Sequence, residues 1–305
     1  MTALLVSHRF RSVYGDAFVA AAKARGIELE LLVLPDDPEA RLADDVAARA
    51  EVAYFSSDVF PQFGKPFFSA TRKAAGLRWL HVFNAGVDHP VFASILERGV
   101  RLTTSSGTAS TPIAQTAIAG MLHLTRDVAG QTVLVYGFGK IGSEIARLAR
   151  LLGMRVIGMR RNAQPHEHAD EMHTPDQLHA ILARSDWLAL ACPLTHETRG
   201  VITAAALAAM PQGARIVNIS RGEVIDEPAL IAALEKKHLG GAYLDVFAQE
   251  PLPAASPLWE MPNVLVTAHD ASTSDAYDPR INALFLDNLA RWQRKEPLLN
   301  EVTQL

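Results

Sequence analysis

The stretch TVLVYGFGKIGSEIARLARLLG, residues 132–153, decides the fold. It begins with an apolar run of strand length and ends with a run that has the spacing of an amphipathic helix. Between them the residues Gly-Phe-Gly-Lys-Ile-Gly, 137–142, fit the pattern G-x-G-x-x-G. Alone this pattern is weak, but a strand before it and a helix after it are the context in which it binds the pyrophosphate of a dinucleotide. The stretch therefore predicts a dinucleotide-binding βαβ unit.

Each glycine of the pattern has a physical task. The first makes the tight turn, the second lets a pyrophosphate approach the backbone, and the third allows the helix to pack closely on the strand. The N-terminus of the helix then holds the negative charge. The flanking strand and helix disfavour the alternative, a glycine turn without a ligand. We assign to cofactor binding the turn residues Gly137, Gly139, Lys140, Ile141 and Gly142.

The end of the next predicted strand indicates which dinucleotide is bound. Sites for NAD place an Asp or Glu about 20 residues on, where its carboxylate binds the ribose 2′-OH. In this chain Arg160 and Arg161 stand at that place, in RVIGMRRN (155–162). Guanidinium groups match a phosphate dianion well. We therefore expect NADP(H) in preference to NAD(H), with Arg160 the stronger candidate. The alternative is that one or both arginines are solvated surface residues.

Strand and helix signals alternate on both sides of this unit. Apolar runs predict strands at 3–7, 27–34, 52–55, 77–83, 100–104, 154–159, 186–191, 214–219, 241–246 and 263–267. Helical spacing predicts helices at 14–25, 38–49, 66–75, 90–98, 111–125, 175–183, 203–209, 227–237 and 278–294. Ser110 or Thr111 is expected to cap the helix at 111–125. Repeated βα units of this length imply parallel sheets covered by helices on both faces.

Length and composition limit the classes of protein. The 305 residues suggest two domains, at ~150 residues per domain. A net charge of −4 disfavours an extended basic surface for nucleic acid. The single cysteine, Cys192, excludes an intramolecular disulfide framework and a thiolate metal cluster. No apolar run approaches the ~20 residues of a membrane span, and the first residues do not resemble a signal peptide. We expect a cytoplasmic protein without metal, membrane or nucleic-acid partners.

Three further segments each place a charged or titratable residue just past a predicted strand, where open α/β sheets bind ligands. Arg221 follows NIS (218–220), Glu250 lies in LDVFAQEP (244–251), and His269 ends PNVLVTAH (262–269). An Arg can pair with a substrate carboxylate and polarise a carbonyl, and a His can exchange a proton with the same oxygen. A nearby Glu favours imidazolium. Each residue alone has an ordinary structural explanation, but together they predict a catalytic set.

These motifs resemble the D-2-hydroxyacid dehydrogenase family, and within it the glyoxylate/hydroxypyruvate reductase branch. The resemblance covers nearly the whole chain and rests on motifs in a fixed order. They are LRWLHVFNAGVDH (77–89), VLVYGFGKIG (133–142), CPLTHETRGVI (192–202), NISRGEVIDEPAL (218–230), GAYLDVFAQEPLP (241–253) and SPLWEMPNVLVTAH (256–269). The ordered run is far more specific than any one motif.

The resemblance implies an α/β fold of two Rossmann-like, doubly wound parallel-sheet domains with the active site in the cleft between them. Residues 1–107 with 272–305 would form the substrate-binding domain, and residues 108–271 the dinucleotide-binding domain. Arg221, Glu250 and His269 would occupy the catalytic positions. Further roles follow for the backbone amides of Ala85, Gly86 and Val87 at the substrate carboxylate, for Asp245 at the nicotinamide carboxamide, and for Cys192 and Pro193 near the cofactor.

The chain departs from the family pattern at two places. Ala268 stands before His269, where the family usually has Pro, so we expect a somewhat less constrained loop. Residues 126–130 join a helix to a strand almost directly, where the family carries a dimerisation arm of a few tens of residues. Either this chain lacks the arm or a segment is missing from the sequence here, and we favour the missing segment.

The residues and the resemblance together predict reduction of a small 2-oxo acid to the D-2-hydroxy acid by an NADPH-dependent homodimer. Arg221 would bind the carboxylate and the carbonyl oxygen, His269 would donate the proton, and Glu250 would tune His269. A dehydrogenase for another D-2-hydroxy acid is one alternative. Glu250 disfavours formate dehydrogenases, which use Gln there, and long phosphoglycerate dehydrogenases carry a further C-terminal domain. A non-enzymatic NAD(H)-sensing corepressor of the same fold is the alternative from another class.

Overall fold

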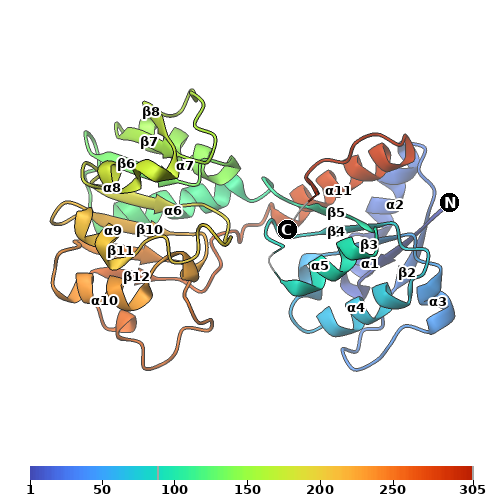
Figure 1. Ribbon diagram of the computed structural model, residues 1–305. Helices are drawn as coiled ribbons and strands as arrows, with labels where there is room; N and C mark the ends of the chain where they lie inside the picture. The colour runs from blue at the N-terminus through green and yellow to red at the C-terminus, as the bar shows by residue number, and fades with distance from the viewer. Residues whose placement is uncertain (88, 304–305) are drawn as a thin grey trace. The chain divides into compact units, whose positions relative to one another are not determined.

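The computed structural model describes residues 1–87 and 89–303, and the chain divides into two compact units (Figure 1). Unit 1 comprises Met1–Thr108 and Asp275–Leu305, and unit 2 comprises Ala109–Ser274. Each unit is built on a largely parallel sheet with helices packed against both faces. The predicted α/β class, with two doubly wound sheets, is therefore confirmed.

The sheet of unit 1 has the strand order β13-β5-β4-β3-β1-β2. Its strands are β1 (Thr2–Val6), β2 (Leu29–Val33), β3 (Val52–Phe55), β4 (Trp79–Val82), β5 (Arg101–Thr104) and β13 (Glu301–Val302). Neighbouring strands are parallel, apart from β13, which pairs antiparallel with β5. One face is covered by α3 (Asp44–Ala48), α4 (Gly64–Lys73) and α5 (Pro90–Glu97). The other is covered by α1 (His8–Val13), α2 (Gly15–Ala24) and α11 (Tyr277–Gln293).

The last helix, α11, belongs to unit 1 because its apolar stripe is buried on that sheet. Phe285 is fully buried, and its ring stacks on Tyr54 at a centroid distance of 4.3 Å. Trp292 stacks on Trp79 at 5.5 Å. Aromatic burial of this extent stabilises the packing by several kcal/mol in total, since a buried aromatic side chain contributes roughly 1.5–3 kcal/mol.

The sheet of unit 2 has the order β12-β11-β10-β9-β6-β7-β8, with parallel neighbours throughout. Its strands are β6 (Thr132–Tyr136), β7 (Arg155–Met159), β8 (Glu171–His173), β9 (Trp187–Leu190), β10 (Arg215–Asn218), β11 (Gly241–Leu244) and β12 (Val264–Val266). One face packs on α6 (Ser110–Leu124) and α7 (Lys140–Leu151). The other packs on α8 (Leu178–Leu182), α9 (Ala204–Ala209) and α10 (Glu227–Glu235). Chain order reverses between β6 and β9, which creates the switch point where such sheets bind ligands.

The structure corrects several predicted element bounds. The helix expected at 38–49 is confined to α3 (Asp44–Ala48), because Asp37 accepts a hydrogen bond from the Glu39 amide and forms a turn instead. The expected cap of α6 was wrong: the helix begins at Ser110, and Ala109 is the N-cap residue. Helix α1 and strands β8 and β13 were not predicted. Each is short, and a short segment carries little periodic signal.

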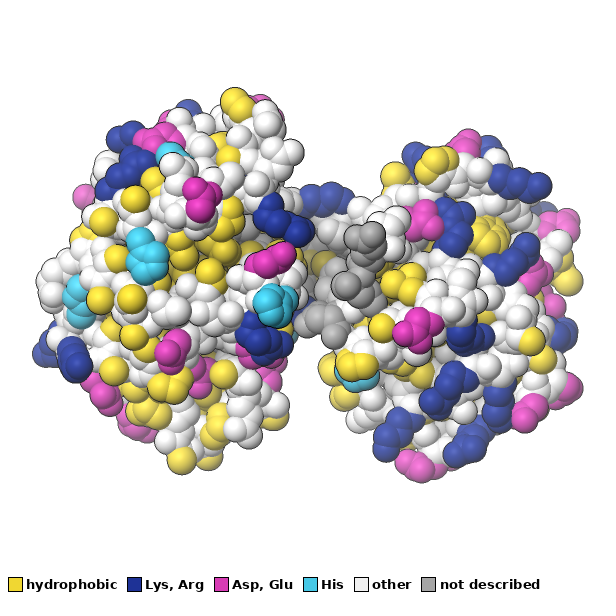
Figure 2. Space-filling model, viewed as in Figure 1, with side chains coloured by type: hydrophobic (Ala, Val, Ile, Leu, Met, Phe, Trp, Pro, Cys, Tyr) yellow, Lys and Arg dark blue, Asp and Glu magenta, His cyan; other side chains and the backbone are white. Residues whose placement is uncertain are grey.

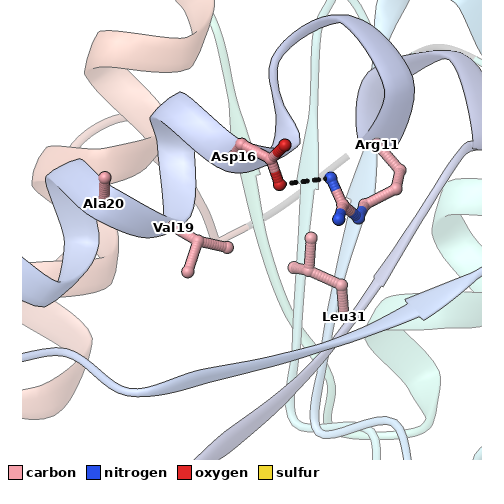
Figure 3. A pocket seen from close by; sticks show the side chains of 5 residues that line it. All are labelled: Arg11, Asp16, Val19, Ala20 and Leu31. Carbon is pink, nitrogen blue, oxygen red and sulfur yellow. Dashed lines mark hydrogen bonds and ion pairs between the residues drawn. The ribbon is translucent and has the colours of Figure 1, made fainter.

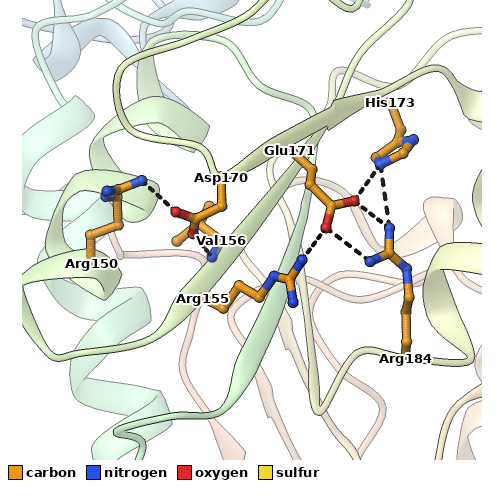
Figure 4. A network of polar contacts seen from close by, with 7 residues as sticks. All are labelled: Arg150, Arg155, Val156, Asp170, Glu171, His173 and Arg184. Atoms are coloured by element: carbon orange, nitrogen blue, oxygen red, sulfur yellow. Dashed lines mark hydrogen bonds and ion pairs between the residues drawn. The ribbon is translucent and has the colours of Figure 1, made fainter.

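Strand β8 lies at the edge of its sheet and carries a network of ion pairs (Figure 4). Glu171 accepts hydrogen bonds from Arg184 and Arg155 and pairs with His173 Nε2 at 2.9 Å. The hydrogen bonds from Arg184 and His173 hold the pKa of Glu171 far below its usual range. Charged groups on an edge strand also oppose edge-to-edge pairing with another chain.

A polar network is buried in the centre of unit 1. His81 is fully buried, its Nδ1 lies 2.7 Å from Thr103 Oγ1, and its Nε2 lies 3.1 Å from Ser105 Oγ. Trp79 Nε1 donates to the same Thr103 hydroxyl at 2.8 Å. Burial lowers the pKa of His81 to about 3, so the ring is neutral near pH 7. Unfolding lets it take up a proton, so stability falls as the pH drops from 6.5 towards that value.

Thr103→Val should destabilise unit 1 by about 2–4 kcal/mol, because it leaves two buried polar groups without a partner while keeping the side-chain shape. The measurement is hydrogen exchange at the amides of β4 and β5, which reports on this unit alone. Thr104→Val is the matched control. The Thr104 hydroxyl accepts a long hydrogen bond of 3.4 Å from the Ser106 amide, so its loss should destabilise unit 1 less. Equal effects of the two variants would contradict the role of the network.

Candidate active site

The glycine turn after β6 is shaped by close backbone contacts. Gly137 has a φ of +100°, and a Cβ there would lie 2.3 Å from the backbone nitrogen of Cys192. A Cβ on Gly142 would lie 2.1 Å from the carbonyl oxygen of Gly137. Both contacts exclude any side chain. A Cβ on Gly139, in contrast, would point into open space, which leaves room for a ligand to approach the backbone.

Helix α7 begins at this turn with Lys140 and Ile141, and Gly139 is its N-cap residue. Among the described residues no side chain caps this end, so its first amide groups can bind an anion. The open approach at Gly139 and the uncapped helix end therefore fit the pyrophosphate of a dinucleotide.

The two arginines after β7 differ in their surroundings. The Arg160 amide donates to the His173 carbonyl at 3.1 Å. The Nε atom of Arg160 is buried and has no hydrogen-bond partner among the described residues, which is an unusual state for a buried donor. Arg161 is mostly exposed, and its Nη1 lies 4.0 Å from Glu197 Oε2. Arg160 therefore has a buried donor without a partner among the described residues, whereas Arg161 faces a carboxylate.

Cys192 and Pro193 follow β9 and lie behind the glycine turn. Burial raises the pKa of the Cys192 thiol to about 11, so the thiol is protonated and a poor nucleophile near pH 7. The Pro193 carbonyl accepts a hydrogen bond of 2.7 Å from the Thr198 hydroxyl. These contacts shape the loop after β9 and give the cysteine a packing role.

Arg221 is positioned by the residues that end β10. The Asn218 amide group donates to the Arg221 carbonyl at 3.1 Å, and Asn218 Oδ1 accepts from the Ser220 amide and hydroxyl. Arg221 Nη1 donates to the Ser220 carbonyl at 2.8 Å. Asn218 and Ser220 belong to a motif of the sequence, but their role could not be predicted, because neither spacing nor residue type shows which carbonyl an amide will bind.

His269 lies after β12 in a left-handed backbone conformation, with φ +54°. Its Nδ1 lies 2.8 Å from Glu250 Oε2, and Glu250 Oε1 accepts from the Phe247 amide at 3.1 Å. Both side chains are partly exposed, 46% for His269 and 37% for Glu250. Because Glu250 holds Nδ1, the proton that His269 can exchange with a ligand is the one on Nε2.

The charges around His269 favour its imidazolium form. The hydrogen bond to Glu250 raises the pKa of His269, burial and the charge of Arg221 oppose this, and Asp245 adds to it. Burial tends to raise the pKa of Glu250, but the hydrogen bonds from His269 and Phe247 and the charge of Arg221 lower it overall. The structure therefore places Arg221, Glu250 and His269 within electrostatic reach of one another.

Asp245 is buried at the end of β11 and holds the segment that carries His269. Its Oδ1 accepts from the Thr267 hydroxyl at 2.6 Å and the Asp270 amide at 3.1 Å, and its Oδ2 accepts from the Ala271 amide at 3.2 Å. The His269 amide donates to the Asp245 carbonyl at 2.8 Å. Sequence reasoning missed this positioning role, which anchors the loop despite the Ala268 departure.

The predicted substrate-loop residues Ala85, Gly86 and Val87 lie in unit 1, after β4. The Asn84 side chain donates to the Gly86 carbonyl, and its Oδ1 is buried without a partner among the described residues.

A hollow elsewhere in unit 1 does not have the chemistry of a catalytic site (Figure 3). It is lined by Arg11, Asp16, Val19, Ala20 and Leu31. Its two charged side chains are exposed and pair with each other at 2.7 Å, and the other side chains that line it are aliphatic.

Other ligand classes find little support among the described residues. On the face of unit 1 drawn in Figure 2, acidic side chains are interspersed with basic ones. Among the described residues, no His, Cys, Asp and Glu side chains gather to hold a metal. Nor does any helix within 1–87 and 89–303 combine the length and apolar character needed to cross a bilayer.

Residues 109–271 match the family described as "D-isomer specific 2-hydroxyacid dehydrogenase, NAD binding domain". A glyoxylate reductase of Korarchaeum cryptofilum is 38% identical over 187 residues, covering 60% of this chain and 55% of that protein. A glyoxylate/hydroxypyruvate reductase B of Pectobacterium carotovorum is 30% identical over 294 residues, covering 82% and 91%. The chain spans about half the length of several curated relatives, the Korarchaeum reductase included.

A solved structure from Xanthobacter autotrophicus, a D-isomer specific 2-hydroxyacid dehydrogenase in complex with NADPH and MES, has the same architecture. It superposes with a TM-score of 0.81 and is 29% identical, and the match covers 99% of this chain and 97% of that chain.

Glu250→Gln should lower the pKa of His269, because it replaces the carboxylate that stabilises imidazolium with a neutral amide. Because the pKa of His269 is raised in the folded state, the pair stabilises the fold at pH values below the ordinary pKa of a histidine. This stability is lost as the pH rises through the pKa of the folded state. An NMR titration of the His269 ring measures the shift. Glu223→Gln, which removes a carboxylate 3.7 Å from Arg199, is the control and should leave the titration in place. An unshifted titration in Glu250→Gln would rule out the pairing.

Proposed function

The chain belongs to the D-isomer-specific 2-hydroxyacid dehydrogenase family, and from this premise we propose that it reduces a small 2-oxo acid, of the glyoxylate or hydroxypyruvate type, to the D-2-hydroxy acid. The observation that carries the proposal is the 2.8 Å hydrogen bond between Glu250 and His269, beside the charge of Arg221. Support also comes from relatives named glyoxylate reductase and glyoxylate/hydroxypyruvate reductase B.

In the proposed reaction Arg221 binds the substrate carboxylate and draws electron density towards the carbonyl oxygen. A bound dihydronicotinamide supplies the hydride that reduces C2. His269 gives its Nε2 proton to the developing alkoxide oxygen, which completes the alcohol. Glu250 holds the opposite ring nitrogen and keeps the imidazolium form available. The proton lost by His269 is replaced from solvent, to which the side chain is partly exposed.

Other groups are proposed to hold the ligands. The amides at the start of α7 hold the pyrophosphate, Gly139 leaves room for its approach, and Gly137 and Gly142 shape the turn. We further propose that Asp245 binds the nicotinamide carboxamide. The backbone amides of Ala85, Gly86 and Val87 are proposed to bind the substrate carboxylate. A homodimer and a cytoplasmic location stay predictions from the sequence.

We propose NADP(H) as the preferred cofactor. The side chain of Arg160, whose Nε has no partner among the described residues, is proposed to bind a 2′-phosphate through its outer nitrogens. Arg161 is the weaker candidate, because it would have to leave Glu197 to bind the same group. The Xanthobacter relative, solved with NADPH, agrees with this choice.

His269→Ala should lower kcat with glyoxylate or hydroxypyruvate by about 10²–10⁴-fold, the usual contribution of a positioned proton donor. Binding of NADPH should be unchanged, since His269 is proposed to act on the substrate oxygen. The measurement is steady-state kinetics with a panel of 2-oxo acids, together with a fluorescence titration of the cofactor. The control is His179→Ala, which removes an exposed histidine of α8. Near-normal turnover of His269→Ala would refute the assignment.

Arg160→Ser should weaken NADPH binding by about 10–100-fold, the loss expected for a hydrogen bond to a charged group. Binding of NADH should change little, because NADH lacks the 2′-phosphate. Dissociation constants for both cofactors test this, and Arg161→Ser should show a smaller loss. If Arg160→Ser weakens both cofactors equally, the phosphate role of Arg160 is wrong.

A further inference from the structure

The segment 247–250, between β11 and the Glu250 carboxylate, is held through two backbone amides. The Phe247 amide donates to Glu250 Oε1 at 3.1 Å, within the segment itself. The Ala248 amide donates to Glu227 Oε2 at 2.9 Å, outside the segment. Phe247 is buried in the apolar core of unit 2, whereas Ala248, Gln249 and Glu250 are exposed, so apolar burial holds the start of the segment and does little for the rest. Glu227 therefore supplies a side-chain tie between this segment and the rest of unit 2.

The same peptide unit packs against the loop that carries Arg221. A Cβ on Gly222 would lie 1.8 Å from the carbonyl carbon of Phe247 and 2.2 Å from the nitrogen of Ala248. The backbone at Gly222 therefore lies directly against the peptide whose N–H group Glu227 accepts. A rotation of this peptide would disturb Arg221 on one side and Glu250 on the other.

Glu227 is itself well anchored. It begins α10, whose N-cap residue Asp226 accepts from the Ala229 amide at 3.1 Å. The Asp226 amide in turn donates to the Ile202 carbonyl at 3.0 Å, and the neighbouring Ile225 is buried. The N-terminus of a helix also favours a negative side chain. The backbone of Glu227 is therefore fixed, and its carboxylate offers an acceptor to the exposed part of the segment that follows the buried Phe247.

We propose that Glu227 is a positioning residue for the reaction, which holds the Phe247–Ala248 peptide so that Glu250 reaches His269 and Gly222 keeps Arg221 in place. Glu227 Oε2 lies 2.9 Å from the Ala248 nitrogen. Glu227 therefore acts through the backbone and does not touch the substrate. The position of this peptide also sets the position of Glu250, because one carboxylate oxygen accepts from the Phe247 amide and the other binds His269. The inference rests on the proposed roles of Glu250 and His269.

The charged groups around His269 determine how its pKa should change when Glu227 is replaced. Glu250 and Asp245 favour its proton, and Arg221 and burial oppose it. If Glu227 is removed, Glu250 is no longer held against Nδ1, and the opposing charge of Arg221 remains. The pKa of His269 should then fall in the same direction as in Glu250→Gln. A role in stability alone would leave the titration where it is.

The experiment compares Glu227→Ala, Glu227→Gln and wild type by NMR titration of His269 and by the pH profile of kcat with glyoxylate. Glu227→Ala should lower the pKa and reduce kcat by about threefold to tenfold on the alkaline side, where the proton donor is depleted, with KM for NADPH unchanged. Glu227→Gln still offers an oxygen to the Ala248 amide and should behave like wild type. Thr203→Ala, which removes the N-cap bond of α9, is the matched control for lost stability.

Each outcome decides the proposal. A shift in Glu227→Ala with rescue by Glu227→Gln supports it, whereas equal shifts in both would assign the effect to lost charge and overturn it. No shift in Glu227→Ala would also overturn it. Should Glu227→Ala fail to fold, Glu227→Asp, which withdraws the carboxylate by one methylene, must show the shift instead. The NMR readout needs no turnover, so failure of the proposed reaction with an intact His269 shift would overturn the function and leave the positioning role standing.

Discussion

The strands of unit 2 run in one direction, so the loops after them leave the same edge of the sheet. Two pairs of these loops meet without room for a side chain between them. Gly137 lies against the backbone of Cys192, and Gly222 lies against the peptide after Phe247. The first contact sets the turn that opens α7, and the second joins the loop of Arg221 to the segment of Glu250. Close backbone packing between loops at this edge of the sheet thus positions both the anion-binding helix end and the charged side chains.

The buried carboxylate of Asp245 extends this constraint to His269. A left-handed backbone is unfavourable by roughly 1–2 kcal/mol for a residue with a side chain. The hydrogen bonds that Asp245 accepts from the 267–271 segment offset that strain and keep the loop in one conformation. Backbone strain at a functional site persists where the surroundings over-determine it, as they do here. The residue at the end of the neighbouring strand therefore fixes the backbone of His269, and the imidazole ring is left free to bind Glu250.

Electrostatics in the candidate site is a balance of opposing terms. Glu250 favours the proton on His269, while burial and Arg221 favour its release. The net effect raises the pKa of His269, which favours the imidazolium form that a proton donor needs. The same balance makes the site sensitive to small displacements of Glu250, since its carboxylate is the main group that favours imidazolium. The tie between Glu227 and Ala248 matters for this reason, although it lies one step removed from the reacting atoms.

The sequence by itself determined the α/β class and the strand–turn–helix around Gly137, because the spacing of apolar residues and the residue types of a turn are local properties of consecutive residues. It also marked Arg221, Glu250 and His269 as candidates by their places after strands, and their catalytic roles stay predictions. It did not reveal the short edge strand β8 or the true start of α6, where the periodic signal is weak. Nor did it reveal that Asp245 accepts from the segment that carries His269, or that Glu227 accepts from the Ala248 amide. Those hydrogen bonds join residues far apart in the chain, and only the assembled sheet brings the carboxylates within reach of the amides.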